Sequence, residues 1–444
     1  MKRVHRAAAA CWLLLLACTG ARAADNYGYV GTVSGVVFSA PSPSFSGAAG
    51  FTTFNGLIDG LSQAGIAQAV PQYNGTQSAS FAVNLRGLSA AAAFPNQGAT
   101  GSGALLNFAI PSLGINQSFQ GANRDASIQL LKDFLKQGDT AGRIQRAYAR
   151  SSPFDPIAGN PASLQARLVA QDFDSAFTAF ASNIVEAPRA VALAMADTGT
   201  RSDIAQAGPG GIMPAAAAFR PMPGAGLQYA GYHSQGLTES SYSLPLSLTF
   251  RSDLDPRRQI SLNLPLGVSN VGGATSYSAG LGGSLRMPLT TSWALSGAVN
   301  YGLAGSHDLD SAGQIASAAV TSSYVIRAAP VDIGIGNMVG YYRTLSTTAG
   351  GISVDPKIAN TVFRNGLLAS HRVSWFGGGL SMEYSVVNTY YAGTDLYLNS
   401  YTELRVALGS NKRADSVRSY VQAGAGYLFS SKTHGWSLDL GYWF

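Results

Sequence analysis

The feature that most restricts the fold of this 444-residue chain is a regular alternation of apolar and polar side chains in its C-terminal half. From about residue 226 onward, the chain divides into segments of roughly 9–14 residues, separated by turn-rich breaks. Within these segments every second side chain tends to be apolar. Neighbouring side chains of a β-strand point to opposite faces, so each segment predicts a strand with one apolar face.

Two early segments show the alternation most clearly. Between Tyr242 and Arg251, Tyr, Leu and Phe occupy the even positions, whereas Ser, Pro, Thr and Arg occupy the odd ones. The same division separates Ile, Leu and Val from Ser, Asn, Pro and Gly between Ile260 and Val268. The pattern predicts about twelve strands, an even number, near residues 226–234, 242–251, 260–268, 277–287, 293–301, 314–328, 331–345, 359–375, 378–392, 399–410, 416–430 and 434–444.

A soluble β-sandwich or jelly roll also alternates, but two properties of the predicted strands favour a membrane barrel. Their polar face consists mostly of Ser, Gly, Asn and Thr, whereas a soluble sandwich exposes charged side chains to water. Aromatic residues gather near the strand ends, as they do at the two interfaces of a bilayer. The predicted fold class is therefore mainly β, with a C-terminal antiparallel transmembrane β-barrel preceded by a mixed α/β N-terminal domain with helices.

The last predicted strand carries the strongest local signal. Trp436, Leu438, Leu440, Tyr442 and Phe444 share one face, and Phe444 is the final residue. This end resembles the C-terminus of Gram-negative outer-membrane barrels, porins and autotransporter translocators included. The resemblance implies that Tyr442 and Phe444 form a signal for the barrel-assembly machinery, and that outer-membrane lipid surrounds the barrel.

The first 23 residues have the composition of a secretory signal peptide. Lys2, Arg3 and Arg6 precede an apolar stretch of about 11 residues, and Ala21-Arg22-Ala23 supplies a small-x-small cleavage site. A lipoprotein signal ending at Cys18 is the alternative, which the bulky Leu16 disfavours. Cleavage near Ala23 would remove both cysteines and leave 25 of the 29 basic residues against 23 acidic ones, a net charge of +2. Such a chain lacks disulfides and thiolate metal sites, and has no concentrated basic surface for nucleic acid.

Three regions are expected between the signal and the barrel at 226–444. Residues 24–122 are rich in Gly, Ala and Ser, with short β-like runs at 29–38, 78–88 and 105–114 and a helix near 54–69. Residues 123–196 read as helical, with a cap at Asn123 or Asp125. Residues 197–225 contain several Pro, Gly and Ala residues and predict a linker into the barrel.

Two helical stripes stand out in residues 123–196. Ile128, Leu131 and Leu135 lie on one side of the first helix, and a longer helix is expected to begin at Pro161. On the longer helix, apolar side chains recur at spacings of four, four and three, at Val169, Phe173, Phe177 and Phe180. A stripe of this kind is expected to pack into an ordinary small core. The alternative places the helix inside the barrel or against its mouth.

Catalytic motifs are missing from the mature sequence. Its four histidines match no zinc or nucleophile spacing, and no GxSxG elbow is present. His371 and Glu383, on adjacent predicted strands, form the one pair that suggests chemistry, although a structural polar contact is the expected role. The chain is therefore predicted not to be an enzyme and to require no cofactor or metal.

Charged residues in the middle of the predicted strands should face the lumen, because a charge at the lipid midplane costs about 2–4 kcal/mol. Arginines outnumber carboxylates in this set, which predicts a mildly cationic wall that favours anions. The alternative is that these side chains hold a resident segment that closes the pore. The predicted lumen-lining residues are Arg251, Arg286, Arg327, Asp332, Arg364, Arg372, Glu383, Glu403, Arg405, Arg418 and Asp439.

Taken together, these patterns predict a protein of the cell outer membrane that acts as a channel or export conduit. Residues 24–225 would form a plug or periplasmic adaptor and could contact a periplasmic or exported protein. An autotransporter-like barrel that displays residues 24–225 as a surface adhesin or passenger is the first alternative. An outer-membrane enzyme is the second, and would need a side-chain cluster that the sequence alone does not bring together.

Overall fold

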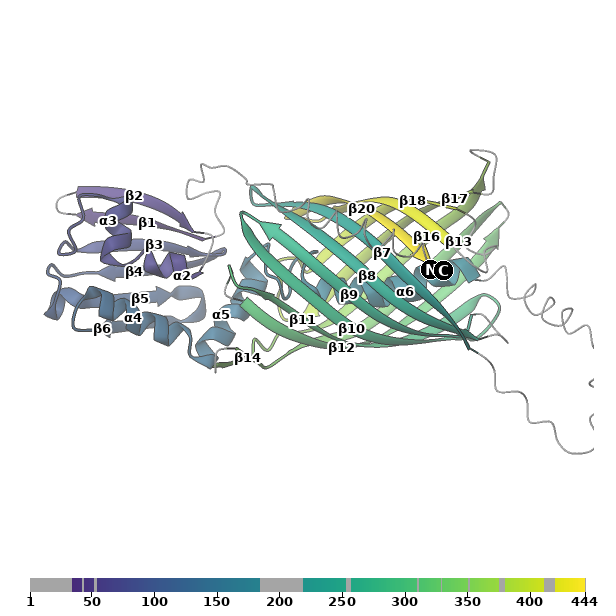
Figure 1. The fold of residues 1–444 in the computed structure, drawn as a ribbon, viewed down its shortest axis with the longest axis horizontal. Coiled ribbons are helices and arrows are strands. Elements are labelled where there is room, and N and C mark those ends of the chain that lie inside the picture. Colours follow the sequence, from purple (N-terminus) through teal and green to yellow (C-terminus); the bar gives the residue numbers. More distant parts are fainter. Residues whose placement is uncertain are drawn as a thin grey trace, which may run out of the picture.

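The computed structural model describes residues 34–41, 44–51, 54–183, 219–252, 257–309, 311–328, 330–349, 352–374, 380–410 and 420–443. They form a small N-terminal α/β domain, a closed β-barrel, and a helix that lies inside the barrel (Figure 1). The predicted signal peptide, most of the predicted linker, Arg418 and Phe444 lie outside the described residues.

The barrel has twelve antiparallel strands, which confirms the predicted number and the fold class. Each strand pairs with its neighbours in the chain, and the last strand pairs with the first to close the sheet. The strands are β7 (Phe219–Ser234), β8 (Leu237–Ser252), β9 (Gln259–Val271), β10 (Ala274–Pro288), β11 (Trp293–Ser306), β12 (Ser311–Ala328), β13 (Val331–Leu345), β16 (Ala359–Val373), β17 (Leu380–Gly393), β18 (Ser400–Gly409), β19 (Tyr420–Phe429) and β20 (Thr433–Trp443).

The alternation predicted from the sequence separates the two faces of the barrel wall. Leu281, Val299 and Leu438 project outward with exposed fractions of 62%, 63% and 50%, whereas the inner positions carry mostly Ser, Gly, Asn and Thr. Outward-facing aromatic residues lie toward both ends of the strands, for instance Tyr277 at one end and Trp293 at the other. An apolar exterior is the arrangement of a membrane barrel and the reverse of a soluble sandwich. Among the described residues, none of the helices has the length and apolarity needed to cross a membrane.

The barrel begins at Phe219, ahead of the predicted start at residue 226. Pro221 and Pro223 made this part of the sequence look like a linker. In the structure, β7 pairs with β8 from Phe219 onward but with β20 only from Gly224 onward. Among the described residues the two prolines pair with β8 alone, so they lie in a part of β7 with one open edge, a position that prolines in sheets commonly take.

The N-terminal domain is a six-stranded antiparallel sheet of order β2-β1-β3-β4-β5-β6 with helices on one face (Figure 1). Its strands are β1 (Ser34–Pro41), β2 (Ser44–Phe51), β3 (Ala79–Leu85), β4 (Leu88–Phe94), β5 (Leu105–Ile110) and β6 (Ile115–Gln120). β3 and β5 lie within predicted runs, and β1 overlaps the run at 29–38, of which residues 29–33 lie outside the described part of the chain; β2, β4 and β6 were not predicted. Leu57, Phe81, Phe94, Ile128 and Leu131 are buried between the sheet and the helices.

The helices of this domain follow local capping signals. The predicted helix over 54–69 is two short helices, α2 (Phe54–Asp59) and α3 (Gln63–Ala69), and Ser62 caps α3 by accepting the Gly65 N–H at 3.1 Å. Asn123, one of the two predicted caps, accepts the Ala126 N–H at 2.9 Å at the start of α4 (Arg124–Leu135). The helix α5 (Gly138–Ser151) follows and leads toward the barrel.

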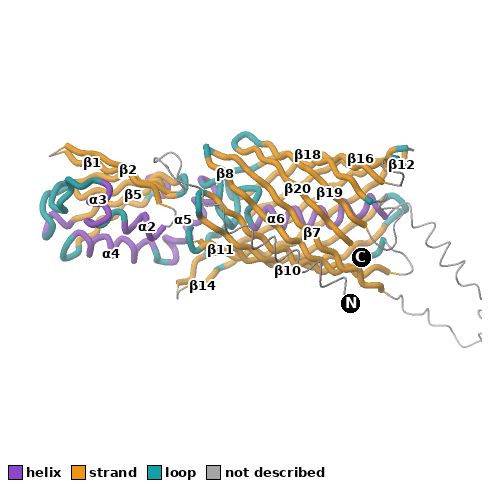
Figure 2. The backbone as a smooth tube through the Cα atoms, turned by 45° about the horizontal axis from the view of Figure 1, so that its top comes forward, coloured by secondary structure: helices purple, strands orange, loops and turns teal. Residues whose placement is uncertain are grey.

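The longest helix, α6 (Leu164–Asn183), runs along the inside of the barrel (Figure 2). The sequence favoured an ordinary small core for its apolar stripe, and this expectation is wrong. The barrel lumen, which was the alternative, is the observed location. Val169, Phe173 and Phe177 are buried in one cluster with inward-facing barrel residues such as Tyr342 and Leu368. The side chain of Phe180 lies outside the described part of the chain.

Candidate functional site

The lumen is shaped to hold α6 because glycines replace side chains on the inner wall beneath it. A Cβ at Gly336 would lie 2.4 Å from a ring carbon of Phe177, and one at Gly366 would lie 2.9 Å from Phe173. Nearer the N-terminus of the helix, a Cβ at Gly302 would lie 2.8 Å from a methyl carbon of Leu164. These distances are shorter than van der Waals contact, so a side chain at any of these positions would force the facing side chain of α6 to move.

Polar contacts fix the helix within this glycine-lined wall. The Asp172 carboxylate accepts the Tyr342 hydroxyl at 2.7 Å and the Asn300 amide at 2.7 Å. Further along, the Arg167 guanidinium donates to the Ser241 hydroxyl at 2.9 Å on the other side of the lumen. Because buried polar groups are costly unless paired, these contacts favour one rotation and one depth of the helix.

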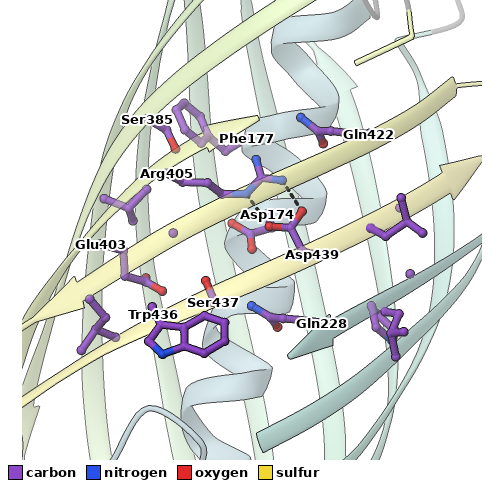
Figure 3. A pocket seen from close by; sticks show the side chains of 18 of the residues that line it. Asp174, Phe177, Gln228, Ser385, Glu403, Arg405, Gln422, Trp436, Ser437 and Asp439 are labelled. Atoms are coloured by element: carbon purple, nitrogen blue, oxygen red, sulfur yellow. Dashed lines mark hydrogen bonds and ion pairs between the residues drawn. The ribbon is translucent and has the colours of Figure 1, made fainter. Parts of the chain in front are cut away.

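The opposite side of α6 faces a cavity of about 280 Å³ rather than a packed wall. Asp174 projects from the helix toward an ion pair between Arg405 on β18 and Asp439 on β20 (Figure 3). The Arg405 Nε donates to Asp439 Oδ1 at 2.9 Å, and a terminal guanidinium nitrogen of Arg405 donates to Oδ2. The cavity is also lined by polar side chains of Gln228, Ser385, Gln422 and Ser437.

A second ion pair lies deeper in the lumen. The Arg364 guanidinium contacts Glu403 Oε2 at 2.8 Å and donates to the Thr389 hydroxyl at 2.7 Å. Its Cζ atom lies 5.3 Å from the ring centroid of Phe173 on α6. Two of the predicted lumen arginines thus face carboxylates, and this pairing reduces the positive potential that the sequence suggested.

The remaining predicted lumen residues differ in position. Arg251 and Arg286 lie on the inner face, with Arg286 buried, and Glu383 is buried where it accepts the Gln422 amide at 2.8 Å. Three others occupy positions that the alternation assigns to the inner face, but they lie at strand ends near the barrel rim: Arg327, Asp332 and Arg372. The predicted role of these residues in pore selectivity stays a prediction.

His371 and Glu383 do not form a site. Glu383 projects into the lumen, whereas the His371 ring lies beside Tyr384 on the outer face, at 5.9 Å between ring centroids. Adjacent residues of a strand point to opposite faces, and Glu383 pairs in register with Ser370 rather than with His371. Within the described residues, no group of three or more His, Cys, Asp or Glu side chains is arranged to hold a metal ion.

Residues 152–163, which join α5 to α6, close one mouth of the barrel. Nearly all of this segment is buried, and Ile157 contacts the inner wall where a Cβ at Gly313 would lie 2.7 Å from its side chain. Backbone hydrogen bonds tie the segment and the end of α5 to the loop between β17 and β18, from Tyr397 to Ala149 at 2.8 Å and from Leu398 to Gly159 at 3.1 Å. We call residues 152–163 the mouth segment.

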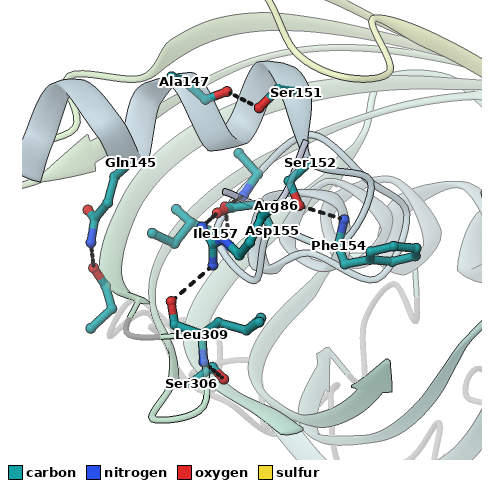
Figure 4. A network of polar contacts seen from close by, with 12 residues as sticks. Arg86, Gln145, Ala147, Ser151, Ser152, Phe154, Asp155, Ile157, Ser306 and Leu309 are labelled. Atoms are coloured by element: carbon teal, nitrogen blue, oxygen red, sulfur yellow. Dashed lines mark hydrogen bonds and ion pairs between the residues drawn. The ribbon is translucent and has the colours of Figure 1, made fainter. Parts of the chain in front are cut away.

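An arginine of the N-terminal domain reaches the mouth segment. Arg86 contacts Asp155 Oδ2 at 3.1 Å and also donates to the Leu309 carbonyl of a barrel loop at 3.3 Å (Figure 4). Asp155 accepts the N–H groups of Ile157 and Ala158 at 2.9 and 3.1 Å. Burial raises the pKa of the Asp155 carboxyl above its usual value, and the Arg86 charge opposes this shift.

The turn that carries Arg86 is specialised for this contact. Arg86 and Gly87 form a two-residue turn between β3 and β4 with φ values of 52° and 90°, as expected of a type I′ hairpin. A Cβ at Gly87 would lie 2.5 Å from the Ser151 carbonyl oxygen at the end of α5. The N-terminal domain is therefore seated against the barrel. Arg86 and Asp155 are 69 residues apart, so no local pattern in the sequence pointed to their contact.

Further contacts place α5 against barrel loops at the same mouth. The Arg146 Nε donates to the Pro356 carbonyl at 2.6 Å, and the Gln145 amide donates to the Ala312 carbonyl at 3.4 Å. Pro356 follows the small hairpin of β14 (Thr347–Ala349) and β15 (Ile352–Val354). All of these loops lie at the end of the barrel opposite to the start of β7 and the end of β20.

Neither a protein-family model nor a curated protein matches this sequence. Solved structures do resemble it. The β domain of the Bordetella autotransporter BrkA is 15% identical, and the match covers 50% of this chain and 98% of that one with a TM-score of 0.40. The closed antiparallel sheet and its apolar outer face are themselves those of an outer-membrane β-barrel.

Two further structures are similar to this outer-membrane barrel. The translocator domain of the autotransporter NalP from Neisseria meningitidis is 14% identical, covering 59% of this chain and 98% of that one with a TM-score of 0.37. An outer-membrane channel from Pseudomonas putida is 11% identical, covering 54% of this chain and 99% of that one with a TM-score of 0.36. The matches include both autotransporter translocators and channels.

Proposed function

We propose that this protein is an autotransporter-like anchor, whose barrel holds the N-terminal domain on the outer surface of the cell. One observation carries the proposal, namely the direction in which α6 threads the barrel. Leu164, at its start, lies near Gly302 and the mouth segment, whereas Ala176 accepts a hydrogen bond from Ser323, toward the other end. The helix α6 therefore runs through the lumen away from the N-terminal domain, toward the end of the barrel at which β7 begins.

The topology of the strands supports the orientation. An even number of antiparallel strands puts the start of β7 and the end of β20 at the same end of the barrel. If the assembly machinery reads the C-terminal strand from the periplasm, this end faces the periplasm. The N-terminal domain, at the opposite end, then faces outward. The β14–β15 hairpin, on the connection from β13 to β16, also lies at that end, where bacterial barrels carry their longer loops.

A gated export conduit remains a second candidate, favoured by the cavity beside α6. About 280 Å³ lies between the helix and the β18–β20 side of the wall, with charged groups around it. A conduit for freely diffusing solutes is less favoured, because α6 and the mouth segment both occupy the lumen. In this second reading the N-terminal domain would act as a plug rather than as a displayed domain.

Cysteine labelling of intact cells tests the orientation, since both cysteines of the chain lie within the predicted signal. Ala64→Cys places an exposed thiol on α3 of the N-terminal domain, and Thr291→Cys places one in the turn between β10 and β11 at the opposite end. A membrane-impermeant maleimide should label Ala64→Cys on intact cells and Thr291→Cys only after the outer membrane is permeabilised. The reverse pattern would place the domain in the periplasm and contradict surface display.

A further inference from the structure

The contact between the N-terminal domain and the mouth segment is a buried ion pair. The side chains of Arg86 and Asp155 are 4% and 0% exposed. Among the described residues, Arg86 is the only charged side chain that contacts Asp155. Burial of an ionised carboxylate is very unfavourable unless an opposite charge accompanies it. The buried position of Asp155 therefore depends on an arginine from the N-terminal sheet.

Asp155 in turn organises the loop that fills the mouth of the barrel. Its Oδ1 atom accepts both the Ile157 and the Ala158 N–H groups, and its backbone carbonyl accepts the Asn160 side-chain amide at 2.7 Å. Residues 152–160 are all buried. A carboxylate that moved out to reach water would give up the first two of these hydrogen bonds. The folded shape of the mouth segment is thus tied to the position of one buried charge.

Arg86 reaches Asp155 from the turn between β3 and β4, and this turn must be seated for the contact to form. The Cζ atom of Arg86 lies 3.6 Å from the centroid of the Tyr148 ring on α5, and its guanidinium donates to the Leu309 carbonyl between β11 and β12. The turn itself rests on the end of α5, with no space for a side chain at Gly87. Lifting the turn would therefore withdraw the positive charge from the mouth segment and from the barrel loop together.

We infer that the N-terminal domain is a latch on the mouth of the barrel. While the β3–β4 turn is seated, Arg86 neutralises Asp155 and the mouth segment stays closed. When the turn lifts away, the carboxylate is left without its counter-charge, and the segment loosens until water reaches it. The coupling is reciprocal, so a closed mouth segment also favours the seated domain. This coupling goes beyond surface display and does not depend on which way the barrel faces.

A buried thiol in the mouth segment can report whether the segment is closed. Ser152 is 1% exposed, and Ser152→Cys replaces one small polar group by another of similar shape. Both cysteines of the chain lie within the predicted signal, so the mature protein would carry this thiol alone. The measurement is the rate of maleimide labelling of purified full-length mature protein in detergent. Surface display is tested separately on intact cells, so failure of one proposal leaves the other unaffected.

Two arginine variants separate the latch from an ordinary contact at the mouth. Arg86→Gln leaves Asp155 buried without a counter-charge and should raise the labelling rate at least about tenfold. Arg146→Gln is the matched control, because Arg146 donates to the uncharged Pro356 carbonyl and its loss should have a clearly smaller effect. The heat-dependent shift on SDS gels checks that each barrel is folded. An unchanged rate in Arg86→Gln, or equal rates in the two variants, would overturn the inference.

Removing the second charge distinguishes charge coupling from a defect in the turn. Asp155→Asn keeps a side-chain oxygen that can accept the Ile157 and Ala158 N–H groups but carries no charge. Combined with Arg86→Gln, it should return the labelling rate to within a few-fold of the wild type. If the double variant is labelled as fast as Arg86→Gln alone, the mouth segment does not open because of an unpaired charge.

The part played by the domain as a whole needs a variant that leaves both charges in place. Phe81, in β3, is 2% exposed in the core of the N-terminal sheet. Phe81→Ala should weaken that sheet, release the turn that carries Arg86, and raise the labelling rate of Ser152→Cys in the same direction as Arg86→Gln. A mouth that stays closed after the N-terminal sheet has unfolded, as judged by limited proteolysis, would show that the domain is not its latch.

Discussion

The barrel and the N-terminal sheet are both antiparallel and both poor in charge within their strands. They differ in where their apolar side chains lie, because the barrel exposes many of them on its outer surface and the N-terminal sheet buries them under helices. In the barrel, Leu281 and Val299 project outward, and the inner wall is mostly polar or glycine apart from the apolar residues that pack on α6. In the N-terminal sheet, Phe81 and Phe94 are buried beneath helices, and Ala82 and Ala91 face outward. The same alternation of apolar and polar side chains thus suits two environments, since lipid favours an apolar exterior and water favours an apolar core.

The largest expected effect comes from removing the N-terminal core while leaving the barrel intact. Phe81→Ala deletes a fully buried ring that packs edge-to-face on Phe94, with 6.2 Å between centroids. Such a truncation costs about 3–5 kcal/mol, enough to unfold a small domain. Limited proteolysis should then degrade the N-terminal domain, whereas the barrel keeps its heat-dependent shift on SDS gels. Loss of that shift would mean that the two parts fold as one unit.

An added charge on the outer face should destabilise the barrel much more than the N-terminal sheet. Leu281→Arg puts a charge on the lipid-facing surface near the middle of β10 and should destabilise the barrel by about 2–4 kcal/mol. Ala82→Arg puts the same charge on the outer face of β3, where water should accept it with a change within about 0.5 kcal/mol. Denaturant unfolding in detergent micelles or bilayers measures both. Equal costs would contradict the assignment of lipid to one face and water to the other.

Overpacking the glycine wall should have an intermediate effect that shows in conductance. Gly336→Ala places a methyl group where Phe177 now lies and should cost about 1–3 kcal/mol as α6 shifts. Planar bilayers should show a quiet wild type and intermittent openings of the variant. Gly297→Ala is the matched control, because nothing lies within 4 Å of its Cβ position. Similar openings in both variants would exclude a seal formed by α6 against this wall.

The sequence predicted the barrel better than the segment that fills it, for a physical reason. Alternation is a local property, so the face of the strand on which Trp436 and Leu438 lie can be predicted from their neighbours in the sequence alone. The place of α6 depends on residues from many strands. Phe173 and Phe177 showed a buried stripe, but their neighbours Gly336 and Gly366 carry no side chain and gave no signal. The contact between Arg86 and Asp155 depends on a turn and on a loop far apart in sequence, and no period joins them.

The smallest effect is expected at the ion pair beside the cavity. Arg405 and Asp439 are each about a quarter exposed on the lumen side, so replacing Arg405 by Gln should change stability by no more than about 1 kcal/mol. The charge balance of the cavity changes more, because Asp174, Glu403 and Asp439 would then face Arg364 alone. In the Gly336→Ala background, the openings should therefore favour cations more strongly when Arg405→Gln is added, as measured by the reversal potential in a salt gradient. An unchanged reversal potential would mean that ions do not pass through this cavity, and that the two sides of α6 differ in packing but not in permeation.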